Sequence, residues 1–130
     1  MPEVLLADDN PSDVYLIREA LREHAVDCVL HVVTDGKDAL GAISGETGAP
    51  SISLIILDLN LPRTSGFAVL ERVRASRKCN RKPVVVFSSS DAEEDREQAR
   101  RLGASYYLRK PSTLKDLMSI GEVLKKILAG

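Results

Sequence analysis

The sequence predicts an α/β fold, in which a parallel sheet is covered by the helices that connect its strands. Short apolar runs alternate with amphipathic stretches along the 130 residues, as parallel sheets with crossover helices require. Residues 54–57 are apolar at every position, as in a strand that is buried on both faces. Acidic residues directly follow this run and the run at 3–7, so negative charge gathers where two predicted strands end.

Five runs rich in large apolar residues predict the strands. The first two hold leucines and valines, the next two are apolar almost throughout, and the fifth is short and contains two tyrosines. The predicted strands are residues 3–7, 29–33, 54–57, 83–87 and 106–108.

The first two helices are predicted from apolar residues at helical spacing and from the polar residues before them. One helix begins at about Ser12, after Pro11, and Ser12 and Asp13 supply polar residues for its first turn. Asp35-Gly36 turns the chain into the second helix. The segment 44–51 is rich in Gly, Ser and Pro and predicts a loop.

The last three helices follow the third, fourth and fifth strands. Asp91 can cap the fourth helix, and Gly103 ends it. These helices are predicted at residues 66–75, 92–102 and 113–128. We expect one domain over residues 1–130, without an effector domain, because this length supports one core and not two.

The composition is that of an ordinary soluble protein, with 44% hydrophobic and 28% charged residues. The net charge of −1 gives no reason to expect nucleic acid or a membrane surface as a partner. No apolar run approaches the roughly 20 residues that cross a bilayer. The two cysteines, Cys28 and Cys79, have no metal-ligand spacing and are too few for a disulfide framework. We therefore expect a cytoplasmic protein.

Chemistry-bearing residues follow four of the predicted strands. If all crossovers are right-handed, the carboxyl ends of the strands share one edge of the sheet, where open α/β sheets bind ligands. Three carboxylates at one edge are unstable without a cation or a proton, and hard oxygen ligands favour Mg²⁺ or Mn²⁺. With no Cys or His in the set, a carboxylate would be the nucleophile, and a phosphoryl group would give an acyl phosphate. The residues at this edge are Asp8, Asp9, Asp58, Asn60, Ser88, Ser89, Ser90, Lys110 and Pro111.

In order and spacing, these residues resemble the receiver domains of two-component response regulators over the whole chain. The resemblance implies a flavodoxin-like (βα)5 fold, a doubly wound parallel sheet with strand order 2-1-3-4-5. The stretch 58–63, the segment Asp9-Asn10-Pro11 and the serine-rich end of the fourth strand are most similar to single-domain regulators that partner phytochrome-type histidine kinases.

The resemblance also implies a role for each residue of the site. Asp58 resembles the phosphoacceptor, and Lys110 resembles the lysine that pairs with the phosphate. Asp9 and Asp58 resemble direct Mg²⁺ ligands, Asp8 a ligand through water, and Asn60 a ligand through its backbone carbonyl. Further implied roles are the switch hydroxyl for Ser88, the aromatic switch for Tyr107, a small neighbour of the phosphate for Ser89, and a cis peptide for Lys110-Pro111. Asn60 and Ser90 would flank the path of hydrolytic water.

The implied function is a phosphorylation switch and not an enzyme, apart from self-phosphorylation and slow self-dephosphorylation. The partner would be a sensor histidine kinase, and helix four, strand five and helix five would form the output face. Acids at 93–97 and lysines at 115, 125 and 126 would pair across a symmetric homodimer through this face, although a solvated surface explains these charges equally well.

Two other functions stay open from the sequence. A dehalogenase-like phosphatase also forms an aspartyl phosphate, but Asp58-Leu59-Asn60 lacks the second acid of that motif. A phosphorelay intermediate would pass the phosphoryl group onward. Tyr107 could equally be a plain half-buried strand residue. The sequence names neither the cognate kinase nor the target.

Overall fold

The computed structural model describes residues 1–44, 52–77 and 79–129. The predicted loop at 44–51 therefore lies, apart from Ser44, outside the described residues. The strands are β1 (Glu3–Ala7), β2 (Val29–Val33), β3 (Leu54–Leu57), β4 (Val84–Ser88) and β5 (Tyr106–Arg109). The helices are α1 (Pro11–Glu23), α2 (Gly36–Ser44), α3 (Gly66–Ala75), α4 (Glu93–Arg101) and α5 (Leu114–Ala129).

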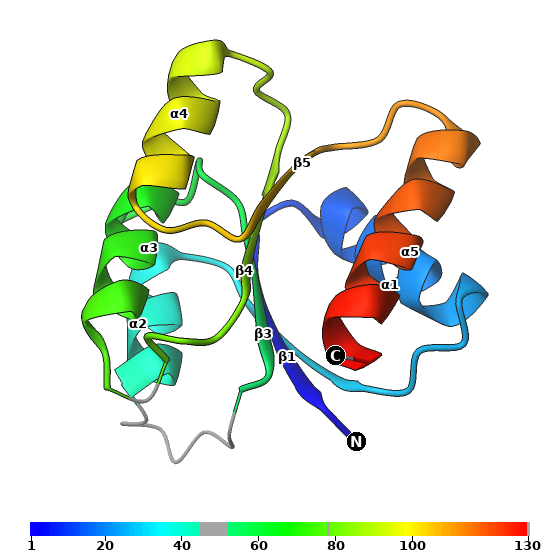
Figure 1. Cartoon of the computed structure of the whole chain (residues 1–130), viewed down its shortest axis with the longest axis horizontal. Coiled ribbons are helices and arrows are strands. Elements are labelled where there is room, and N and C mark those ends of the chain that lie inside the picture. The colour runs from blue at the N-terminus through cyan, green and yellow to red at the C-terminus, as the bar shows by residue number, and fades with distance from the viewer. Residues whose placement is uncertain (45–51, 78, 130) are drawn as a thin grey trace.

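The five strands form one parallel sheet in the order β2-β1-β3-β4-β5, which confirms the predicted α/β fold and its strand order. Helices α2, α3 and α4 cover one face and α1 and α5 cover the other (Figure 1). Along β3, Ile55 and Leu57 pack toward the first group of helices, while Leu54 and Ile56 pack toward α1 and α5. Burial on both faces explains why this strand is apolar at every position.

The register of the central strands brings the predicted site residues together. Ala7 on β1 lies opposite Leu57 on β3, and the amide of Asp58 donates a hydrogen bond to the carbonyl of Ala7 at 2.9 Å. On the other side, the amide of Lys110 donates to the carbonyl of Ser88 at 2.8 Å. The residues that follow these strands therefore meet at one edge of the sheet.

Two helix starts differ from the prediction. Helix α1 begins at Pro11, and its cap is Asn10, whose side chain accepts a hydrogen bond from the Ser12 amide. Proline suits this first position because its missing N–H would have no partner there. The predicted cap Asp91 is wrong: the cap position of α4 is Ala92, which has no side-chain capping bond. Asp91 pairs with Arg96 at 2.8 Å instead, since a nearby guanidinium competes for its carboxylate.

No helix within the described ranges is both long enough and apolar enough to cross a membrane.

Candidate functional site

The ends of β1, β3 and β4 hold their polar side chains in the same local turn. One oxygen of Asp8 accepts a hydrogen bond from the Asn10 amide at 2.9 Å. One oxygen of Asp58 accepts from the Asn60 amide at 3.0 Å, and the Ser88 hydroxyl accepts from the Ser90 amide at 3.1 Å. Because each bond fixes one oxygen to the backbone two residues ahead, the second carboxylate oxygen of each aspartate is left to face the site.

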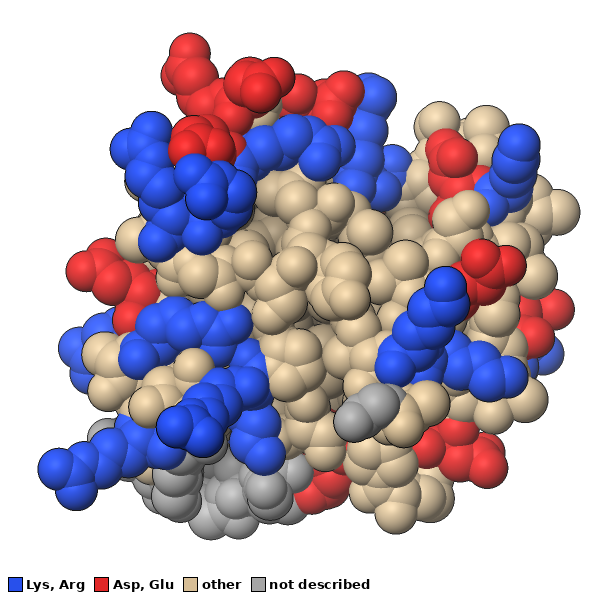
Figure 2. All heavy atoms as spheres, in the orientation of Figure 1, with Lys and Arg blue, Asp and Glu red and all other residues tan. Residues whose placement is uncertain are grey.

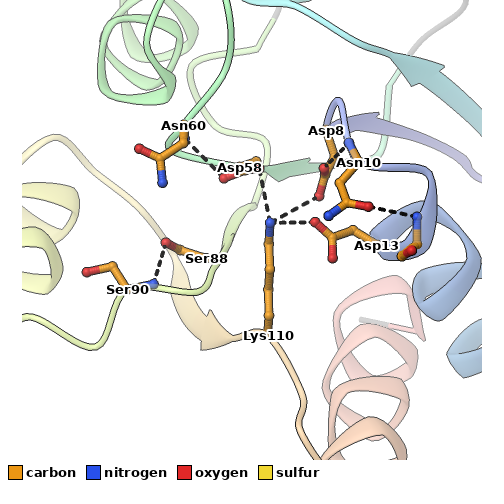
Figure 3. A network of polar contacts seen from close by, with 9 residues as sticks. Asp8, Asn10, Asp13, Asp58, Asn60, Ser88, Ser90 and Lys110 are labelled. Carbon is orange, nitrogen blue, oxygen red and sulfur yellow. Dashed lines mark hydrogen bonds and ion pairs between the residues drawn. The ribbon is translucent and has the colours of Figure 1, made fainter.

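The ammonium of Lys110 lies among three carboxylates (Figure 3). Its Nζ lies 3.1 Å from Oδ2 of Asp58, 3.7 Å from Oδ2 of Asp8 and 2.5 Å from Oδ2 of Asp13. Burial lowers the pKa of Lys110, but the hydrogen bonds to Asp13 and Asp58 outweigh burial and raise it above the ordinary value. The positive charge of Lys110 therefore neutralises part of the negative charge of the three carboxylates.

Asp8 is the least satisfied member of this group. Its side chain is fully buried, and its Oδ2 has no hydrogen-bond partner within the part of the chain that the structure describes. Burial raises the pKa of Asp8 from 3.8 to about 7, against the opposing effects of the Asn10 amide and Lys110. A second cation at this point would supply the missing partner and remove the cost of the buried charge.

The donor atoms fit a divalent metal ion. One carboxylate oxygen from each of Asp8, Asp13 and Asp58 lies within 4.8 Å of the other two. All three are hard oxygen ligands, which suit Mg²⁺ and Mn²⁺, and the unpartnered oxygen of Asp8 faces the group. The arrangement is consistent with the expected divalent metal site at the carboxyl edge of the sheet.

The membership of the acid group differs from the sequence expectation at one position. Asp9, expected as a direct metal ligand, is exposed and lies outside the group of three. Asp13, expected only as a first-turn residue, is 5% exposed and lies inside it. Asp13 is thus a site residue that the sequence reasoning missed. The sequence did contain evidence for this burial. Asp13 precedes Ile17 and Ala20 by four and seven residues, and this helical spacing puts Asp13 on the buried side of α1.

The remaining predicted residues lie around β4. Ser88 is fully buried, and Ser89 is exposed. The Ser90 hydroxyl contacts Asp95 at 2.5 Å, which ties it to α4. The hydroxyl of Tyr107 donates to the carbonyl of Ser90 at 3.0 Å, and its ring is half-buried. Ser90 and Tyr107 therefore form a link between the end of β4 and β5.

The guanidinium of Arg96 on α4 lies 4.6 Å from the centre of the Tyr107 ring. Tyr107 on β5 therefore contacts both α4, through Arg96, and the end of β4, through Ser90.

The expected cis peptide at Lys110-Pro111 is wrong, because no described peptide bond is cis. The trans form is the lower-energy isomer of a bond before proline unless its surroundings select the other.

Comparison with known proteins agrees with this geometry. The sequence family described as the response regulator receiver domain matches residues 4–122. The response regulator Rcp1 of Synechocystis is 35% identical over 120 residues, which cover 90% of this chain and 82% of that protein. A probable methanogenesis regulatory protein, FilR2 of Methanothrix harundinacea, is 31% identical and is covered over 83% of its length by 98% of this chain.

Solved structures give the same result. The phosphorylated cyanobacterial phytochrome response regulator RcpA superposes with a TM-score of 0.89 at 31% identity, with 99% of this chain and 94% of that chain covered. The Mn²⁺-bound form of Rcp1 superposes with a TM-score of 0.87, also at 31% identity, over 97% of this chain and 93% of that chain. The chain therefore belongs to the family of response regulator receiver domains.

Proposed function

We propose that this domain is a phosphorylation switch that accepts a phosphoryl group on Asp58 from the phosphohistidine of a sensor histidine kinase. The orientation of Asp58 carries the proposal. The Asn60 amide holds one carboxylate oxygen, so the other oxygen is available as a nucleophile and faces Lys110 at 3.1 Å. The related RcpA is known in a phosphorylated form and the related Rcp1 with Mn²⁺, which supports a site for both groups.

The transfer is a single displacement at phosphorus. A bond forms between Asp58 Oδ2 and phosphorus while the bond from phosphorus to the imidazole nitrogen breaks, and the imidazole leaves with the electron pair. A divalent metal held at this site would supply positive charge for the transferred oxygens. As the family resemblance implies, Asp58 and the Asn60 carbonyl would hold the metal together with Asp9, which is exposed in this structure, and Asp8 would hold it through water. Asp13 pairs with Lys110 instead.

Two side chains of the domain would then contact the transferred group. Lys110 already faces Asp58 and can move to a phosphoryl oxygen, where its charge is of the right sign. The Ser88 hydroxyl accepts from the Ser90 amide, so its own hydrogen is available to donate to the phosphoryl group. Ser89 is the small neighbour on the exposed side.

The output surface that we propose is the face of α4, β5 and α5. A shift of Ser88 toward the phosphate would move Ser90, whose carbonyl holds the Tyr107 hydroxyl. Tyr107 would then carry the change to β5 and, through Arg96, to α4. Asn60 and Ser90 would flank the path of hydrolytic water and so affect the phosphoryl lifetime.

Homodimer formation through the same face stays a prediction. Acidic and basic side chains lie side by side on α4 in Figure 2. Glu97 pairs with Arg100 and Arg101 of its own helix, which holds the pKa of Glu97 down at about 2. The other acids of α4 are Asp95, which the Ser90 hydroxyl contacts, and Glu93 and Glu94, which are exposed; we therefore expect a dimer to use Glu93 and Glu94.

The test is phosphorylation by acetyl phosphate in the presence of Mg²⁺, followed by intact mass measurement. We expect one phosphoryl group on the natural chain, none after addition of EDTA, and none on Asp58→Asn. Asp38→Asn is the control, because Asp38 is an exposed aspartate on α2 and should leave labelling unchanged. Full labelling of Asp58→Asn would overturn the proposal, and steady turnover of p-nitrophenyl phosphate would favour the phosphatase alternative.

The partner that we propose is a phytochrome-type histidine kinase, on the strength of the likeness to Rcp1 and RcpA. Phosphotransfer should be measured against all histidine kinases of the same genome at short reaction times. Fastest transfer from a phytochrome-type kinase is the expected result. Faster transfer from an unrelated kinase would refute this partner while leaving the phosphoacceptor role intact, and onward transfer to a histidine protein would favour a phosphorelay intermediate.

A further inference from the structure

Asp13 is a buried acid whose place in the molecule is not explained by its helix. It is the third residue of α1, where the positive end of the helix dipole favours a carboxylate. That effect needs no burial, and the chain provides three comparisons. Asp38, Asp95 and Asp116 are the third residues of α2, α4 and α5; Asp38 and Asp116 are exposed, and Asp95 is half-buried. Only Asp13 of these four is buried, with 5% of its surface exposed.

Burial of a carboxylate is unfavourable unless it is paired. The partner of Asp13 is Lys110, whose Nζ lies 2.5 Å from Asp13 Oδ2 and 3.1 Å from Asp58 Oδ2. Figure 3 shows the ammonium between these two side chains, which come from α1 and from the end of β3. Lys110 donates a hydrogen bond to each of these carboxylates, so Asp13 shares the lysine with Asp58.

We propose that Asp13 is a positioning residue that holds Lys110 in the unphosphorylated state and competes with the phosphoryl group for it. The inference rests on the proposed function of Asp58. Once Asp58 Oδ2 is bonded to phosphorus, the phosphoryl oxygens offer Lys110 a new partner on the same side. Lys110 must then share its contacts between these oxygens and the carboxylate of Asp13.

Asp13 also acts on the modified state directly. Its carboxylate oxygen lies within 4.8 Å of a carboxylate oxygen of Asp58, so it faces an anionic group placed on Asp58 with a like charge. Both effects favour the unphosphorylated state. Asp13 thereby lowers the affinity of the site for an anionic group on Asp58, while Asp58 itself is unchanged.

An equilibrium measurement separates this role from the chemical step. The probe is the beryllium trifluoride anion, which forms a tetrahedral complex of phosphoryl size on a carboxylate, titrated at saturating Mg²⁺. We expect Asp13→Asn to bind this anion about 10-fold more tightly than the natural chain, because a like charge close to the site is removed. Asp38→Asn is the matched control at the same helix position and should stay within about twofold. Asp13→Glu, which keeps the charge, should bind the anion as weakly as the natural chain.

The Mg²⁺ affinity, measured by calorimetry without the anion, gives the second readout. A loss for Asp13→Asn as large as the loss for Asp58→Asn would make Asp13 a metal ligand and overturn the competing role. Unchanged or weaker anion binding by a folded Asp13→Asn would overturn it as well. If the natural chain neither binds the anion nor is labelled by acetyl phosphate, the proposed function of Asp58 fails instead, so the two failures can be told apart.

Discussion

Asp8 should make the metal-free protein less stable as the pH rises, and Asp8→Asn should remove this effect. Asp8 is fully buried, and its Oδ2 has no hydrogen-bond partner among the described residues. The amide of asparagine keeps the acceptor that the Asn10 amide needs at 2.9 Å, and its NH₂ group can donate to the neighbouring carboxylates. The substitution therefore removes a buried charge with little change in shape.

The magnitude follows from the pKa of Asp8, which burial raises from 3.8 to about 7 in the folded protein. Between these values the folded state binds more protons than the unfolded state, so the free energy of unfolding falls as the pH rises through this window. Each pKa unit corresponds to about 1.4 kcal/mol, so the full penalty above pH 7 is about 4 kcal/mol. At about pH 5 only about 1–2 kcal/mol of it is present.

The assay is urea unfolding of both proteins in EDTA at about pH 5 and about pH 8, followed by circular dichroism. Asp8→Asn should be stabilised relative to the natural chain by about 2–3 kcal/mol more at the higher pH than at the lower. This difference does not depend on any pH-independent cost of the substitution. Equal effects at the two pH values would refute the reasoning, and Asp38→Asn should show no such difference.

Two further pairs of substitutions test the packing that supports the site, each by urea unfolding. Gly66→Ala should destabilise the protein by about 1–3 kcal/mol, because the new Cβ would lie 2.3 Å from the backbone oxygen of Asp58. Gly41→Ala should stabilise α2 by about 0.5–1 kcal/mol, because among the described residues the new Cβ would have no atom within 4 Å apart from its chain neighbours and its own helix backbone. Equal effects of the two changes would contradict the close approach at Gly66. Arg74→Ala should cost about 2–3 kcal/mol, since its guanidinium donates to the carbonyl oxygens of three loop residues. Arg72→Ala on the exposed side of the same helix should change stability by less than about 0.5 kcal/mol, and a similar loss for both would argue against those bonds.

The strands and the edge of the sheet could be predicted because they depend on local patterns. A run such as 54–57 is typical of a central strand buried on both faces, and in a parallel sheet its carboxyl end lies beside those of its neighbours. The meeting of Asp8, Asp58 and Lys110 follows from this topology alone. Ser88 follows in the same way, because it is the last residue of β4.

Features that depend on competition between side chains could not be predicted from such patterns. Asp91 has the residue type and position of a helix cap, but Arg96 and Arg109 attract its carboxylate and Ala92 takes the cap position. The sequence therefore showed the position of Asp91 but not its pairing with the two arginines. Asp9 lies beside Asp8 after β1 but is exposed, and the sequence order alone does not show which of two adjacent acids the fold buries.

The burial of Asp13 follows from a pattern in the sequence and from the packing of two helices, which explain it only together. Asp13 shares the face of α1 that holds Ile17, Ala20 and Leu21, so this face must bury an acid. Helix α1 lies beside α5 on one side of the sheet, and Lys110 leads into α5 from the end of β5. The ammonium that would pair with a phosphoryl group is therefore the same ammonium that makes the burial of Asp13 tolerable. For this reason the affinity of the site for an anion on Asp58 should depend on Asp13, a residue of α1 that shares Lys110 with the nucleophile.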